Sequence, residues 1–301
     1  MASQPSPLGS ARLQQIRGFE QAQADTIAGL VREHVHVLER TQALALNVVH
    51  EALEQPQSGD ASTPVFFLTQ TAADSLRVAE LALSRGYGTA AVQCSRDALE
   101  AAALALLLAK EPARAERYWE GAELSPGTVR TELQRSGLSE EVVLMMWGLY
   151  DLMSLFAHPN VERLAFVMDE VEKGEGNVLR TFRAGGTTDP AKLHTFANLC
   201  LSAAGLVAML IPETFGGYLP AARLEEYRAA RNDVLRTVME PLRAVLGRAA
   251  ARREERDDDT AAAQHARRLR QRIPAMNVAR AGTRSMGGQA TNKAKRPTRE
   301  Q

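Results

Sequence analysis

The chain has 301 residues, of which 45% are hydrophobic, and it carries 36 basic and 36 acidic side chains. This hydrophobic content is enough to bury a sizeable core, so a globally disordered chain is excluded. Aromatic residues make up only 5% of the sequence, whereas Ala, Leu, Glu and Arg are plentiful. That balance favours packed helices over sheets and predicts an all-α protein.

Several function classes find no support in the sequence. The two cysteines, Cys94 and Cys200, lie far apart and lack the spacing of metal ligands, so we expect no disulfide framework and no metal site. The first dozen residues contain no apolar run, and the longest apolar runs, 101–109 and 203–211, are shorter than the roughly 20 residues that span a bilayer. We therefore expect a cytoplasmic protein without a membrane partner. No motif for a cofactor is complete, so none is expected.

The first predicted element is a long helix over residues 8–54, a stretch without proline. Its apolar residues recur at helical spacing, with polar interruptions, so the helix resembles a coiled coil with an impure seam. Packing against the rest of the chain and pairing with a second copy in a homodimer would both bury this stripe. We assign residues 1–64 to this helix and the linker that follows it. The stripe consists of Ile16, Ile27, Leu30, Val37, Leu44 and Val48.

Residues 65–256 are predicted to form a helical bundle. Together with the long first helix, the pattern predicts an all-α bundle of about eight helices. Gly86 or Gly88 is expected to take the left-handed cap of the first bundle helix, and Ser125 is expected to begin a short helix as its N-cap. The expected helices cover 65–84, 89–110, two shorter stretches within 111–123 and 125–137, 139–158, 161–172, 190–211 and 220–256.

A disordered basic tail is predicted for residues 257–301, where apolar spacing is lost. Residues 260–301 hold ten basic side chains against one acidic one, a net charge of +9, so the remaining residues are acidic overall. Such a tail can contact RNA or DNA, or fold back loosely on the acidic body. No aromatic residue lies between the basic ones to stack on bases. The candidate nucleic-acid residues are Arg267, Arg268, Arg270 and Arg272.

Polar side chains on two of the apolar helices form the candidate site. Asp151, Ser154 and His158 share one stripe of the 139–158 helix, and Arg96 and Glu100 lie one turn apart on the 89–110 helix. An unpaired buried polar group costs about 1–3 kcal/mol, and a charged one costs more. We therefore predict one shared network, in which Arg96 and Glu100 face Asp151, Ser154 or His158. Tyr150 is expected nearby.

These same helices carry a resemblance to a known superfamily. "GYGTAAVQCSRDALEAAALALLLAKEP", followed some fifty residues later by "LYDLMSLFAHPN", resembles the HEPN-like superfamily of bacterial helical domains. It is most similar to uncharacterised members in which an Arg and a Glu precede a Tyr and a terminal His-Pro. The resemblance covers about residues 65–215. For HEPN ribonucleases it implies metal-independent RNA cleavage by a His and an Arg placed four to six residues before it.

The chain departs from that pattern at the catalytic arginine. The positions four to six residues before His158 hold Ser154, Met153 and Leu152. The sequence therefore favours a non-catalytic module that acts by protein association or nucleic-acid contact. A metal-independent endoribonuclease of a toxin or defence system, with His158 and Arg96 as catalytic residues, is the alternative, and a structural scaffold built on the N-terminal helix is a third. Whether the protein is an enzyme stays open at this level.

Overall fold

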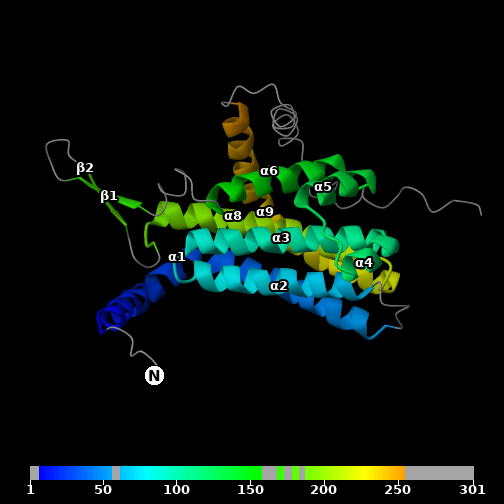
Figure 1. The fold of residues 1–301 in the computed structure, drawn as a ribbon, viewed down its shortest axis with the longest axis horizontal. Helices are drawn as coiled ribbons and strands as arrows, with labels where there is room; N and C mark the ends of the chain where they lie inside the picture. Colours follow the sequence, from blue (N-terminus) through cyan, green and yellow to red (C-terminus); the bar gives the residue numbers. More distant parts are fainter. Residues whose placement is uncertain (1–6, 56–61, 158–167, 173–177, 183–186, 255–301) are drawn as a thin grey trace, which may run out of the picture.

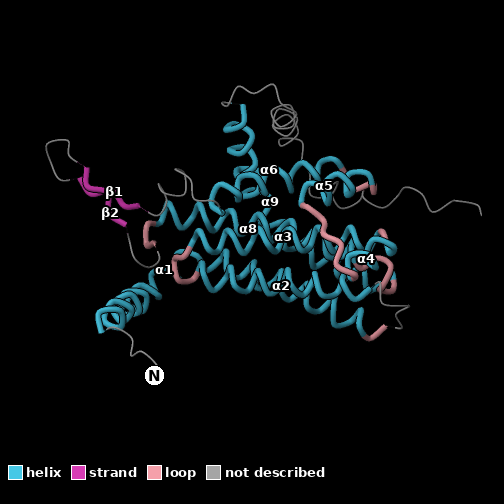
Figure 2. Tube along the Cα trace, viewed as in Figure 1, coloured by secondary structure: helices cyan, strands magenta, loops and turns pink. Residues whose placement is uncertain are grey.

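The structure, a computed structural model, describes residues 7–55, 62–157, 168–172, 178–182 and 187–254. Helices account for nearly all of this part of the chain (Figure 2). The predicted all-α bundle with a long N-terminal helix is confirmed, and the predicted basic tail lies outside the described residues. The eight helices in the described ranges are α1 (Pro7–Leu53), α2 (Thr63–Leu83), α3 (Gly88–Lys110), α4 (Pro112–Trp119), α5 (Pro126–Arg135), α6 (Glu140–Ala157), α8 (Pro190–Thr214) and α9 (Ala221–Glu254).

A small β-hairpin replaces part of one predicted helix. The helix expected over 161–172 is wrong at its C-terminal end, because β1 (Met168–Glu172) pairs antiparallel with β2 (Val178–Phe182). Residues 161–167 lie outside the described residues. The connecting sequence "KGEGN" contains two glycines and an asparagine, which favour turns, and the flanking segments contain β-branched residues. The turn-forming and β-branched residues therefore outweigh the helical spacing of the apolar residues, and a hairpin forms in place of the end of the predicted helix.

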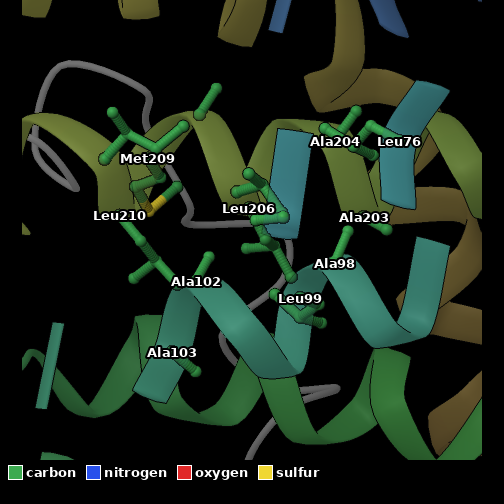
Figure 3. Close-up of a cluster of buried hydrophobic side chains, with 14 of the residues drawn as sticks. Leu76, Ala98, Leu99, Ala102, Ala103, Ala203, Ala204, Leu206, Met209 and Leu210 are labelled. Atoms are coloured by element: carbon green, nitrogen blue, oxygen red, sulfur yellow. The ribbon is translucent and has the colours of Figure 1, made fainter. Parts of the chain in front are cut away.

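The centre of the core is shared by two helices rather than held by one. α3 packs on α2, α8, α6 and α5. α8 is equally central, since it packs on α3, α9, α1 and α2, and almost every residue from Phe196 to Thr214 is buried. Alanines at the α3–α8 contact, including Ala98, Ala102 and Ala203, bring the two helices close together (Figure 3).

α1 packs within the chain over its C-terminal half. From Ile27 onward its buried residues face α2, α8 and α9, whereas its N-terminal end extends beyond the bundle (Figure 1). Four positions of the predicted stripe are buried, and two are not: Ile16 is half-buried, and Leu30 is 42% exposed while its neighbour Val31 is buried. Packing inside one chain therefore accounts for the apolar stripe from Ile27 to Ala52.

The turn between α2 and α3 sets the position of the candidate site. Gly86 has a φ of +78°, so it is the glycine that takes the left-handed conformation of the two proposed. Gly88 has a different role: a Cβ at this position would lie 1.8 Å from the Phe196 ring of α8. The absence of a side chain at Gly88 lets α3 begin directly against α8, and this contact fixes where Arg96 lies two turns later.

Candidate functional site

Arg96 joins α3 to α6. Its Nη2 donates hydrogen bonds to Glu100 Oε1, at 2.9 Å, and to the hydroxyl of Tyr150. The guanidinium carbon also lies 4.5 Å from the centroid of the Tyr150 ring, within the range of a cation–π contact. The Arg96 side chain is 17% exposed and that of Glu100 is 33% exposed. The structure thus brings together three of the predicted site residues, Arg96, Glu100 and Tyr150.

The network changes the acidity of its members. Burial acts to lower the pKa of Arg96, but the hydrogen bond with Tyr150 and the charge of Glu100 outweigh it, so the pKa is raised. Burial and a hydrogen bond with Glu100 raise the pKa of the Tyr150 phenol. Arg96 is therefore a firmly charged cation, and Tyr150 is a neutral phenol at physiological pH. Neither group is prepared to exchange a proton near neutrality.

The structure describes two of the other predicted members, Ser154 and Asp151. The Ser154 hydroxyl donates to the backbone carbonyl of Tyr150 at 2.8 Å, a bond within its own helix. Asp151 is half-buried on α6 beside Tyr150. His158 lies outside the described residues, as do the tail residues Arg267, Arg268, Arg270 and Arg272. Tyr150, which was expected only to lie near the network, is thus the α6 residue to which Arg96 donates a hydrogen bond.

A pocket opens beside this network. It has a volume of about 300 Å³ and lies between α3, α5 and α6, with Leu68 of α2 and Leu124 at its edges. The walls are mainly apolar. The polar or aromatic side chains that line it are Asp97, Glu100, Arg130, Trp147 and Tyr150. We call this cavity the α3–α5–α6 pocket.

Arg130 and Trp147 extend the polar rim of the pocket across to α5. The Arg130 guanidinium carbon lies 3.7 Å from the centroid of the Trp147 indole, a close cation–π stack. Trp147 in turn meets Tyr150 edge to face, with 5.6 Å between the ring centroids. Burial lowers the pKa of Arg130, although an arginine keeps its charge at any physiological pH. A chain of contacts therefore runs from Arg130 through the two rings to Arg96.

Asp97 gives the α3 side of the pocket an acidic character. Burial, and then the negative charge of Glu100, raise the pKa of its carboxyl group. Glu100 is neutralised by Arg96, whereas no hydrogen bond or ion pair to Asp97 occurs among the described residues. The pocket is thus acidic at its α3 end and basic at its α5 end.

The sequence reasoning missed Arg130 and Trp147. Trp147 lies three residues before Tyr150, so the two share a face of α6, and this spacing was a usable signal. Arg130 gave no such signal, because only the packing of α5 on α6 brings it to the indole.

A second buried ionic cluster was also missed. Glu213, at the end of α8, accepts hydrogen bonds from Arg231 at 3.1 Å and from Arg228 at 3.4 and 3.3 Å, both on α9. The side chains of Glu213 and Arg231 are only 7% and 4% exposed. Because its cations are already paired and both Glu213 and Arg231 are almost fully buried, this cluster holds α8 to α9 and is a structural feature.

Two further observations bear on the class of protein. α8 has the length and apolar composition of a membrane span, and 89% of its most apolar 18-residue window is buried inside the bundle. Core packing therefore accounts for its composition. Among the described residues, no group of three or more His, Cys, Asp or Glu side chains is arranged to hold a metal ion.

Comparisons with known proteins do not assign the chain to a family. No protein-family model, no curated protein and no solved structure matches the chain. The HEPN-like resemblance therefore rests on the motifs of the sequence itself.

Proposed function

We propose that the chain is a non-catalytic, HEPN-like binding module that holds its partner in the α3–α5–α6 pocket. The observation that carries this proposal is the pocket itself, an apolar cavity of about 300 Å³ with a rim of polar and aromatic side chains. Concave, mainly apolar sites with a few convergent polar groups are the usual form of ligand sites, and their volumes begin at about 300 Å³. The pocket suits a small molecule or a single apolar side chain of a partner protein.

The state of Arg96 supports binding over catalysis. Its Nη2 is bonded to Glu100 and Tyr150, and one face of its guanidinium is covered by the Tyr150 ring. These contacts fix the guanidinium between α3 and α6, although Arg96 Nε is buried without a hydrogen-bond partner among the described residues. A phosphate-stabilising arginine directs several donors at its substrate, and the Nη2 donors of Arg96 are used within the protein instead. The ribonuclease alternative requires Arg96 to reach a phosphate with its remaining donors, or to give up its Nη2 contacts.

Cleavage is tested by incubating the purified protein with total RNA in EDTA, beside His158→Ala and Arg96→Ala variants. We expect no cleavage above the level of a buffer control in any of the three. Cleavage by the natural chain that both variants lose, with their circular dichroism and melting temperature retained, would overturn the non-catalytic proposal.

Binding is tested with the indole inside the pocket as a reporter. The chain has two tryptophans, and Trp119 is 59% exposed on α4, so Trp119→Phe leaves Trp147 as the single tryptophan, which can be excited selectively over the tyrosines. Titration with 1-octanol, a neutral probe, should give a saturable change in Trp147 fluorescence. Ala101 lines the pocket, so Ala101→Phe in the same background should fill it and abolish the change. A linear response, or an identical response in both proteins, would contradict the proposal.

A further inference from the structure

Arg130 is the cation of the pocket that lacks an anionic partner. Among the described residues, no carboxylate lies within 4 Å of its guanidinium, and it donates no hydrogen bond to another side chain or to the backbone. The neighbouring arginines differ: Arg114 pairs with Glu111 and Glu132, and Arg135 pairs with Glu132. Glu132 is thus used by other partners, although it lies only two residues from Arg130 on α5.

Arg130 lies where its unpaired guanidinium can bind an anionic ligand in the pocket. The side chain is half-buried and lines the pocket, and the Trp147 indole covers one face of the guanidinium. A stacked arginine keeps its five N–H donors in the plane of the group, and these match both oxygens of a carboxylate. The indole contact fixes the plane of the guanidinium, so little side-chain freedom is lost when an oxyanion binds.

The rest of the pocket defines what such an anion must be attached to. The walls of the pocket are apolar, so the body of the ligand must be apolar. These walls are formed by Leu99, Leu104, Leu133, Val143 and Met146. The volume of about 300 Å³ limits that body to a short chain or a single ring. At the α3 end, Asp97 forms no ion pair among the described residues, although the charge of Arg96 acts on it, and its carboxylate disfavours a second negative charge there. The ligand therefore carries one anionic group, at the Arg130 end.

We infer that the α3–α5–α6 pocket binds a small monoanionic amphiphile, with a carboxylate-type head group paired to Arg130 and an apolar body held between α3, α5 and α6. This inference rests on the proposed function, because it names the chemical class of ligand for the same pocket. Trp147 has two roles here: it positions the Arg130 guanidinium and forms part of the wall beside the head group.

The test compares three probes of equal chain length at pH 7, below their aggregation concentrations: octanoate, 1-octanol and octylammonium. Affinities are measured by isothermal titration calorimetry, because a change at Arg130 would itself alter Trp147 fluorescence. We expect octanoate to bind about tenfold more tightly than octanol, since a charge-assisted bidentate pair in a partly desolvated site supplies at least 1.4 kcal/mol. Octylammonium should bind no more tightly than octanol.

Variants assign the preference to one side chain. Arg130→Gln should reduce the ratio of the octanoate affinity to the octanol affinity from about ten to about one, and Arg130→Lys should restore part of the preference. Arg135→Gln is the matched control, because this arginine lies on the same helix but outside the pocket, with its side chain 70% exposed. It should bind all three probes like the natural chain.

Each other outcome has a defined meaning. Equal affinity for octanoate and octanol would overturn the inference and leave the proposed binding function standing. Tighter binding of octylammonium would also overturn it, and would make Asp97 the group that selects the ligand. If none of the three probes binds, the inference and the proposed pocket function both fail.

Discussion

Tyr150 explains how an arginine is tolerated beside the most apolar run of α3. Arg96 meets one carboxylate, one hydroxyl and one aromatic face, so most of its charge is compensated although its side chain is only 17% exposed. Sequence reasoning could predict the existence of this network, because an unpaired buried charge is costly. It could not choose between Tyr150 and its neighbours, because a small rotation of α6 decides which side chain faces α3.

Glu100→Ala should lower the free energy of unfolding by about 1–2 kcal/mol, because it removes the carboxylate that pairs with the mostly buried guanidinium of Arg96. Urea unfolding at pH 7 measures the effect. Asp233→Ala is the matched control, since Asp233 pairs with Arg236 on one helix while both side chains are more than half exposed, at 52% and 74%. That change should cost less than about 0.5 kcal/mol. Equal losses for the two variants would mean that Arg96 is solvated.

Removing the carboxylate of the Glu213 cluster should lower the free energy of unfolding more than Glu100→Ala does. Glu213→Met leaves Arg231, whose side chain is 4% exposed, without its carboxylate, and should cost about 3–5 kcal/mol in urea unfolding. The double change Glu213→Met with Arg231→Met removes both charges and should cost less than the single change, because no uncompensated charge stays buried. A double variant that is less stable than Glu213→Met would contradict this account.

At the scale of the elements, the sequence was most informative where local chemistry decides. Ser125 accepts a hydrogen bond from the Thr128 N–H, and Asp189 accepts two from the start of α8, so both predicted helix starts are confirmed. The prediction failed where distant residues decide. α8 was expected to end near Ile211, but it continues through Pro212 to Thr214, where Glu213 is held by arginines of α9. Arg130 escaped prediction for the same reason, since its partner ring lies on another helix.

Gly205 tests the contact between α8 and α9. A Cβ at this position would lie 2.4 Å from Val238 Cγ2, so Gly205→Ala should destabilise the protein by about 1–3 kcal/mol despite the better helix propensity of alanine. Gly29 of α1 is the control, because a Cβ there meets nothing within 4 Å. Gly29→Ala should stabilise by about 0.5–1 kcal/mol. Combining Gly205→Ala with Val238→Ala should cost less than the sum of the two; strict additivity would argue against the clash.

At the scale of the whole molecule, one continuous core joins the N-terminal helix to the rest of the bundle. Buried residues from Ile27 of α1 to Leu246 of α9 belong to the same apolar cluster. The helical period predicted which face of α1 is buried, apart from Ile16 and Leu30, but not what this face packs against, because a second copy would bury the same stripe. The ring pair between His34 of α1 and His194 of α8, 5.4 Å apart and nearly perpendicular, lies at this junction.

That junction should loosen in mild acid. Burial and then the electrostatic effect of the neighbouring His194 lower the pKa of His34 below its ordinary value of 6.5, against smaller opposing effects of Asn198 and Glu33. The unfolded chain then binds the proton more readily than the folded one, so the contribution of His34 to stability is complete above pH 6.5 and is lost as the pH falls through the lowered pKa. The urea concentration at the unfolding midpoint should therefore decrease as the pH is lowered from 7 to 5.5.

His34→Phe keeps a ring at the junction without a titrating group, so it should flatten this pH dependence. His36→Gln alters a histidine whose side chain is 69% exposed and should keep the pH dependence. If His34→Phe retains the full slope, His34 is not the group that couples α1 to pH.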